Sequence, residues 1–134
     1  KTVHESSLSP CVHSIIASRL GWMDDAYKHY LRTSRLDLDD YNKEVHEGLH
    51  ITSMAGTWLS VVEGFGGFNV RDGMPLFSGK LPAAWQGLRF KINFRNRLLD
   101  VVVSEEGTSV TLIAGQPIDV EVNGQVKRLD AQGH

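Results

Sequence analysis

Cysteine is almost absent from this chain of 134 residues, and so are long apolar runs and any large excess of charge of one sign. The single Cys11 excludes an internal disulfide and fits a reducing compartment, so we expect a cytoplasmic location. The longest nearly uncharged stretch, Gly48 to Val62, is too short and too polar to span a bilayer. A net charge of −2 provides no basic surface for nucleic acid or an anionic membrane. We therefore expect neither of these two as a partner.

The sequence signals of several common catalytic and cofactor sites are also missing. No metal-ligand spacing and no serine-nucleophile motif occurs. The glycine-rich run from Gly64 to Phe68 follows an expected helix rather than a strand, so it fails the test for a nucleotide-binding loop. Cys11 has an apolar setting without a polar partner, which is typical of a small buried filler. The chain starts at Lys1 with neither an initiator methionine nor a signal peptide, so we expect a fragment of a larger protein.

The first half of the chain has helical periodicity. Ser9 is a good N-cap, Pro10 suits the first helical position, and Gly21 is typical of a helix end. Later in this half, one helical face should collect a set of apolar residues: Met54, Trp58, Val61, Val62 and Phe65. The expected helices are Pro10–Leu20, Asp24–Arg35 and Ser53–Glu63. Three such helices rarely close a core alone, so we expect their apolar faces to be exposed or covered by another part of a larger assembly.

From about Phe68 onward the period of the apolar residues changes to two, which indicates strands with one buried face. Asn123-Gly124 is a strong hairpin signal. The expected strands include Leu88–Phe94, Leu98–Val103, Ser109–Ile113, Ile118–Val122 and Val126–Leu129. The fold class is therefore α+β, with a helical domain at 1–73 and an antiparallel, sandwich-like domain of about six strands at 74–134.

The most unusual segment runs from Gly48 to Trp58 and places polar residues at the expected start of the third helix. Free N–H groups and the helix dipole make a helix N-terminus suitable for an anion such as phosphate. The candidate phosphate-binding residues here are His50, Thr52, Ser53 and Gly56, because glycine leaves room for a ligand to approach the backbone. The alternative is that Thr52 or Ser53 only caps the helix.

Other polar and aromatic clusters have both a functional and a structural interpretation. His4 to Ser7 combines an imidazole, a carboxylate and hydroxyls, which suits acid–base chemistry but also an N-capping loop. Asp37, Asp39 and Asp40 lack the spacing of a calcium loop, so a solvated acidic loop is expected. Trp58 and Trp85 could stack on sugar rings or fill a core.

Long runs of the chain closely resemble glycoside hydrolase family 65, and in particular its disaccharide phosphorylases. The strongest match is Arg32-Thr33-Ser34-Arg35-Leu36-Asp37-Leu38-Asp39-Asp40-Tyr41-Asn42. Further matches are Thr2 to Ser9, Gly48 to Trp58 and Val62 to Gly67. The resemblance is dense from Lys1 to about Phe77 and looser beyond, through Leu81-Pro82, Trp85 and the strand from Leu88 to Phe94.

This resemblance implies a fold and an activity. The chain would supply the last helices of an (α/α)6 barrel and the small C-terminal β domain. The full-length protein would be an inverting phosphorylase that cleaves an α-glucoside such as maltose, trehalose or kojibiose. Inorganic phosphate would be the co-substrate and β-glucose 1-phosphate the product. The resemblance implies no metal and no organic cofactor, and it implies a homodimer of the full-length, bacterial protein.

The resemblance also implies roles for particular residues. His50, Thr52, Ser53 and Gly56 match the phosphate-binding segment, and Ser6 and Ser7 match a segment close to the same subsite. The general acid of such enzymes is a glutamate upstream of this chain, so Glu5 is not assigned that role. A substrate-binding Lys-Gln pair also lies upstream. We therefore expect no catalytic residue in this chain, and no activity from it alone.

Two rival functions remain open at the level of the sequence. One is a family 65 hydrolase of the trehalase type, in which water would replace phosphate as the nucleophile. The intact run from His50 to Ser53 argues against it. The other is a non-enzymatic carbohydrate-binding β module with a helical extension, which would need an exposed aromatic platform. The sequence does not reveal which disaccharide is cleaved.

Overall fold

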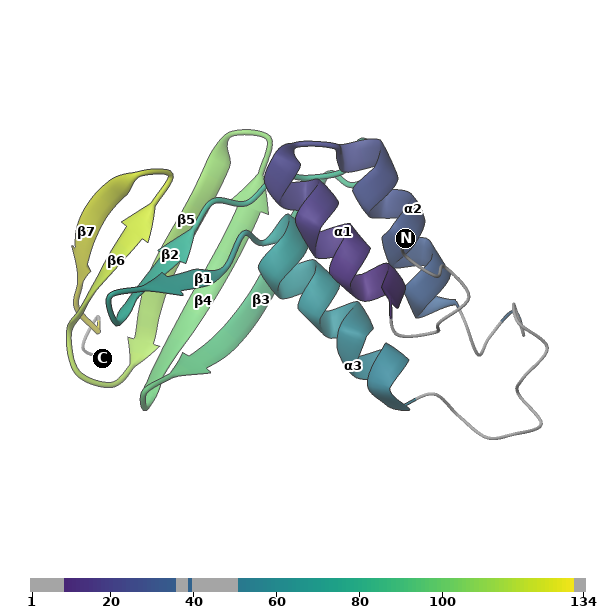
Figure 1. Cartoon of the computed structure of the whole chain (residues 1–134). Helices are drawn as coiled ribbons and strands as arrows, with labels where there is room; N and C mark the ends of the chain where they lie inside the picture. The colour runs from purple at the N-terminus through teal and green to yellow at the C-terminus, as the bar shows by residue number, and fades with distance from the viewer. Residues whose placement is uncertain (1–8, 36–38, 40–50, 132–134) are drawn as a thin grey trace. The chain divides into compact units, whose positions relative to one another are not determined.

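The computed structural model describes residues 9–35, 39 and 51–131, with helices first and strands after them (Figure 1). It divides into two compact units, which meet in the sequence between Phe65 and Gly66. The helical unit contains α1 (Ser9–Leu20), α2 (Met23–Ser34) and α3 (Ile51–Leu59), and α3 continues as the π-helix η2 (Ser60–Phe65). In the described residues no helix is long and apolar enough to cross a membrane.

The predicted helices α1 and α2 are confirmed to within one residue at each end. Gly21 ends α1 with a φ of +80°, and its N–H donates to the Ser18 carbonyl at 3.1 Å. The Trp22 N–H donates to the Ala17 carbonyl at 2.8 Å, which completes a Schellman motif. The third helix differs from the prediction, because it starts at Ile51 and becomes a π-helix from Ser60.

The helical unit packs mainly through small side chains. Ser14 is fully buried on α1, and its hydroxyl donates to the Ala26 carbonyl of α2 at 2.8 Å. One large aromatic residue on η2 adds to this packing: Phe65 is fully buried and its ring meets that of Tyr30 edge-on, with centroids 5.6 Å apart. The other buried residues of the unit include Ala17, Ser18, Thr33, Ser60 and Val62.

Large apolar side chains lie on the outside of this unit. Val12, Ile16 and Leu20 form one row on α1 and are 52%, 49% and 56% exposed. On α3, Met54 and Trp58 are also mostly exposed. The prediction that apolar helical faces would remain uncovered is therefore confirmed.

The predicted apolar face of the third helix is buried only in part. Val62 and Phe65 on η2 are buried, whereas Met54 and Trp58 on α3 are exposed.

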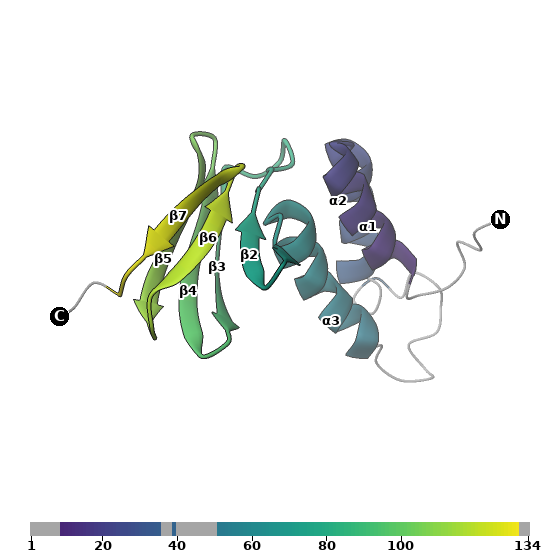
Figure 2. The same ribbon diagram turned by 60° about the vertical axis from the view of Figure 1, so that its left-hand side comes forward.

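The β unit consists of two sheets that lie face to face (Figure 2). In the four-stranded sheet the order is β1 (Asn69–Arg71), β2 (Met74–Phe77), β6 (Ile118–Val122) and β7 (Gln125–Leu129). In the three-stranded sheet the order is β3 (Gly87–Phe94), β4 (Arg97–Ser104) and β5 (Gly107–Ala114). The prediction of a helical half followed by a β domain is confirmed.

One strand pair departs from the predicted antiparallel arrangement. β2 and β6 are parallel, with Leu76 opposite Glu121 and Phe77 opposite Val122. Parallel neighbours need a crossover connection, and here the whole three-stranded sheet lies between them in the sequence. The described strands number seven rather than about six: the five strands located in the sequence, β3 to β7, and a hairpin of β1 and β2. The predicted domain boundary at residues 73 and 74 falls in the turn of this hairpin.

Alternating side chains of both sheets form the core of the β unit. From β4, Leu99, Val101 and Val103 are buried, and Val120 and Val122 are buried on β6. The predicted hairpin turn at Asn123-Gly124 is confirmed by positive φ angles of 49° and 84°.

Candidate phosphate site

The candidate site lies at the N-terminus of α3. Because α3 begins at Ile51, the amides of Ile51, Thr52 and Ser53 belong to the first turn and have no acceptor within the helix. The amides of Ala55 and Gly56 lie deeper and bond to carbonyls four residues earlier. The sequence analysis placed the start of this helix at Ser53, and the helix starts two residues earlier. The amides without an intrahelical acceptor therefore include those of the two hydroxyl residues, Thr52 and Ser53.

The structure describes only part of the predicted site. The backbone of Thr52 and Ser53 lies in the first turn of α3, whereas the structure does not describe their side chains. His50, Ser6 and Ser7 lie outside the described residues altogether. Their convergence on the free amides therefore stays a prediction.

Gly56 has a packing role that the sequence did not reveal. It is buried, and a Cβ atom at this position would lie 2.9 Å from the Cys11 Cβ, 3.0 Å from its Sγ and 3.6 Å from the Thr33 Cγ2. The absence of a side chain thus lets α3 approach α1 and α2 closely. The carbonyl of Gly56 accepts a hydrogen bond from the Ser60 hydroxyl at 2.9 Å. No local pattern could show this, because Cys11 and Thr33 are far away in sequence.

Cys11 behaves as a structural thiol. Burial raises the pKa of its thiol, and the nearby negative charge of Glu63 raises it further. The thiol therefore stays protonated near neutral pH, which makes it a poor nucleophile. This agrees with the expected role as an apolar filler, although the side chain is only half-buried.

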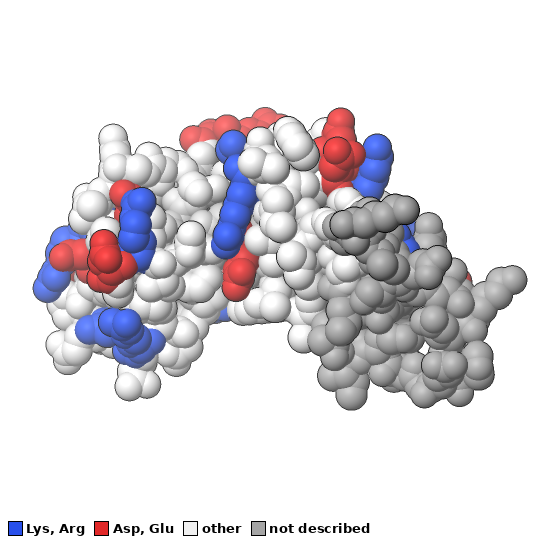
Figure 3. Space-filling view, viewed as in Figure 1, with Lys and Arg blue, Asp and Glu red and all other residues white. Residues whose placement is uncertain are grey.

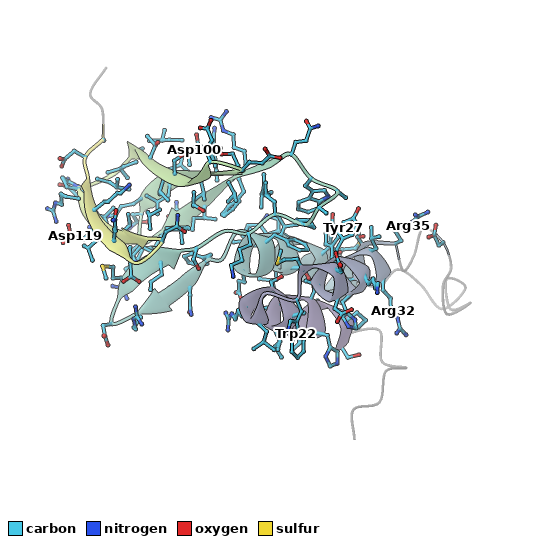
Figure 4. The ribbon with its side chains drawn as sticks, turned by 90° about the horizontal axis from the view of Figure 1, so that it is seen from above. Trp22, Tyr27, Arg32, Arg35, Asp100 and Asp119 are labelled. Carbon is cyan, nitrogen blue, oxygen red and sulfur yellow. The ribbon has the colours of Figure 1, made fainter. Side chains whose placement is uncertain are left out.

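A basic hollow on α2 is a feature that the sequence analysis missed. Lys28, Arg32 and Arg35 line a hollow of about 440 Å³ together with Asp39. Arg32 and Arg35 are labelled in Figure 4. The Arg35 Nε lies 2.7 Å from the Asp39 carboxylate, so Asp39 is held in an ion pair rather than in a cation site. Within the described ranges no group of three or more metal-ligating side chains occurs.

The β unit shows no aromatic platform among its described residues. Phe77 and Phe90 are buried, and Trp85 is half-buried. Phe68 and Phe94 are half-buried and contact each other with ring centroids 6.4 Å apart. A carbohydrate-binding β module needs exposed rings, so this arrangement disfavours that rival function.

Comparison with known families places these two units in one class of carbohydrate-active enzymes, the glycosyl hydrolases. Residues 1–59 match the model described as the glycosyl hydrolase family 65 central catalytic domain. Residues 68–129 match the model described as the glycosyl hydrolase family 65 C-terminal domain. The chain belongs to glycosyl hydrolase family 65.

Several relatives carry names of phosphorylases. A maltose phosphorylase of Bacillus subtilis is 48% identical over 90% of this chain, and an alpha,alpha-trehalose phosphorylase of Thermoanaerobacter brockii is 44% identical over 89%. A solved structure from the human microbiome, provisionally named a kojibiose phosphorylase, matches 97% of this chain with a TM-score of 0.89 and 39% identity. The chain spans 16%, 15% and 18% of these three proteins, about a sixth of their length.

Proposed function

We propose that this chain is the C-terminal part of an inverting glycoside phosphorylase that cleaves maltose- or trehalose-like α-glucosides with inorganic phosphate. β-Glucose 1-phosphate would be the product. The observation that carries this proposal is the N-terminal turn of α3 at Ile51 to Ser53, whose amides have no acceptor within the helix, in a chain whose relatives are named as phosphorylases.

The proposed mechanism needs an acid on one side of the sugar and a nucleophile on the other. Phosphate would be the nucleophile, held by the amides of the first turn of α3 and by His50, Thr52 and Ser53. Ser6 and Ser7 would border the same subsite. Hydroxyls and amides are neutral donors, so they hold the anion without the strong attraction of several lysines. The helix dipole would contribute about 0.3–1 kcal/mol, or about 2 kcal/mol when partly buried.

Gly56 would support this site through the packing of α3 against α1. Its lack of a side chain brings α3 against Cys11 and thereby fixes the direction of the helix axis. A helix directed at the phosphate holds its free amides in one place. In this proposal Gly56 positions the site, whereas its amide, inside the helix, does not bind the anion.

The remainder of the longer protein would supply what this chain lacks. This includes the general acid glutamate, the substrate-binding Lys-Gln pair and the other helices of an (α/α)6 barrel. The barrel helices would cover the exposed rows on α1 and α3. We infer that the chain alone is inactive, that the whole enzyme needs no metal or organic cofactor, and that it is a cytoplasmic, bacterial homodimer.

The disaccharide stays open within this proposal. Relatives named for maltose, trehalose and kojibiose match this chain at 48%, 44% and 35% identity, and one named for 1,2-alpha-glucosylglycerol matches at 30%. The degree of identity over this part of the protein therefore does not select one substrate.

The test is the phosphate dependence of the full-length enzyme. With maltose or trehalose, omission of phosphate should abolish cleavage, and phosphate should yield β-glucose 1-phosphate. His50→Ala should raise the KM for phosphate roughly ten- to hundredfold, because one hydrogen bond to a charged ligand is lost. It should change the KM for the disaccharide much less.

Ser53→Ala should act in the same direction but less strongly. Ser109→Ala, at an exposed position on β5, is a matched control and should change neither constant. Release of glucose at the full rate without phosphate would contradict the proposal and would favour the family 65 hydrolase.

A further inference from the structure

At Gly56, one helical turn after Thr52, α3 comes close to both other helices of its unit. Each of α1, α2 and α3 contacts the other two. A Cβ atom at Gly56 would lie 2.9 Å from the Cys11 Cβ on α1 and 3.6 Å from the Thr33 Cγ2 on α2. The N-terminal part of α3 therefore lies against one residue from each of the other two helices.

Thr33 is a residue that helix propensity alone does not explain. It lies in the last turn of α2 and is only 3% exposed. Threonine is a weaker helix former than alanine, because its branched Cβ restricts the side chain. Its hydroxyl finds a partner within α2, where it donates to the His29 carbonyl at 3.0 Å. This bond holds the side chain in one rotamer, with its methyl group near Gly56.

The contact between Thr33 and Gly56 lies close to the amides of α3 that have no acceptor within the helix. Gly56 follows Ser53 by three residues, which corresponds to about 4.5 Å along the helix axis. Over so short a distance the helix moves nearly as a rigid body, because its hydrogen bonds join successive turns. A displacement of α3 at Gly56 therefore reaches the amides of its first turn almost undiminished. Thr33 and Gly56 both belong to the helical unit, so their contact does not depend on the placement of the β unit.

We propose that Thr33 is a positioning residue for the phosphate subsite, an inference that rests on the proposed phosphorolysis. Cys11 sets the distance between α3 and α1, and the Thr33 methyl group sets the distance between α3 and α2. Together these contacts fix the place of the amides that hold phosphate, whereas Cys11 alone would let α3 slide along α1. Thr33 acts through Gly56 and does not itself bind phosphate.

The test is the steady-state kinetics of phosphorolysis by the full-length enzyme, with inorganic phosphate and either maltose or trehalose as substrates. Thr33→Ser removes the methyl group and keeps the hydroxyl donor. It should raise the KM for phosphate roughly three- to tenfold, because a small misplacement of binding groups is costly. The KM for the disaccharide should stay unchanged, since the upstream part of the protein binds the sugar.

Two further variants separate positioning from stability. Thr33→Val keeps the branched shape and removes the hydroxyl, so it should keep the KM for phosphate of the natural enzyme. Ser14→Ala is the matched control, because Ser14 is also buried and its hydroxyl also donates to a backbone carbonyl, that of Ala26 on α2. Ser14→Ala should lower the Tm and leave the KM for phosphate unchanged.

A Thr33→Ser variant with the KM for phosphate of the natural enzyme would overturn the inference. So would an equal rise in Thr33→Val, because the hydroxyl rather than the methyl group would then be the important part. An equal rise in Ser14→Ala would also overturn it, because a loss of stability would then explain the effect. Cleavage at the full rate without phosphate would overturn the proposed function as well, whereas the other outcomes leave phosphorolysis in place.

Discussion

At Gly56, helix propensity and helix packing oppose each other. Alanine is the better helix former by about 1 kcal/mol, which alone would make Gly56→Ala stabilising. A Cβ atom, however, would lie 2.9 Å from the Cys11 Cβ, and both atoms belong to the stiff part of their helices. We expect Gly56→Ala to lower the free energy of unfolding of the full-length enzyme by about 1–3 kcal/mol through overpacking.

Ala55, the exposed neighbour of Gly56, provides the control. Ala55→Gly should cost about 1 kcal/mol from propensity alone. Urea unfolding of the two variants measures both effects. A Gly56→Ala variant more stable than the natural protein would show that the helices separate easily at this contact.

Asp100 on β4 makes the stability of the β unit depend on pH. Its carboxylate accepts two hydrogen bonds from the Arg89 guanidinium on β3, at 3.0 and 2.7 Å. These bonds and the positive charge of Arg89 lower the pKa of the Asp100 carboxyl, although partial burial opposes the shift. The pair therefore contributes stability above the unfolded pKa of about 3.9, and this contribution is lost as the pH falls through the lower folded pKa.

Asp100→Asn should thus reduce the dependence of the unfolding free energy on pH in the acid range. Urea unfolding near neutral pH and at about pH 3 measures this slope. Arg89→Gln removes the donor instead of the acceptor and should reduce the slope in the same way. If Arg89→Gln kept the full slope, another group would have to hold the Asp100 carboxylate.

At the scale of elements, α1 has its small residues inside and its large ones outside. Ser14 and Ala17 are buried, while the row of Val12, Ile16 and Leu20 is about half exposed. We expect Ile16→Lys to change the unfolding free energy of the 134-residue chain by less than about 0.5 kcal/mol, as at other surface positions. In the longer protein, where this row would be covered, it should cost about 2 kcal/mol or more.

Thermal unfolding of both proteins measures this difference. Val126→Lys on β7 is the control, because Val126 is as exposed as the α1 row and belongs to the β unit. It should be tolerated in both proteins. Equal tolerance of Ile16→Lys in the longer protein would mean that the α1 row stays in water there.

Sequence periodicity predicted the elements whose pattern is local. Alternation located the strands from β3 to β7, and helical spacing located α1 and α2. It missed β1 and β2, which are short, and Pro75 lies in β2. It could not show that β2 pairs in parallel with β6, because pairing between distant segments leaves no local pattern. The hydroxyl residues before Met54 led to the prediction of an anion site, which stays a prediction, whereas the contact of Gly56 with Cys11 required the fold.

At the scale of the whole molecule, the two units differ in their means of stability. The β unit buries large side chains such as Phe77, Leu99 and Leu112, whereas the helical unit buries mainly small ones. The β unit therefore has a core of its own. Acidic and basic side chains are interspersed on the face seen in Figure 3, as is usual for a solvated surface.

We expect residues 66–134 to fold alone with a stability of at most about 3–5 kcal/mol, because one small core rarely supplies more. Residues 1–65 alone should show helical content without fixed side-chain packing. Circular dichroism and the dispersion of methyl signals in NMR spectra measure both properties. An unfolded spectrum from residues 66–134 would show that the β unit depends on the helical one.

The parallel pair of β2 and β6 has a consequence for the order of events during synthesis. β2 leaves the ribosome before its parallel neighbour β6, which comes only after the entire three-stranded sheet has been made. Until then the edge of β2 has no partner, and it is open to pairing with other nascent chains. The four-stranded sheet can close only after β6 has been made, so a premature stop before Ile118 would release a polypeptide prone to aggregation.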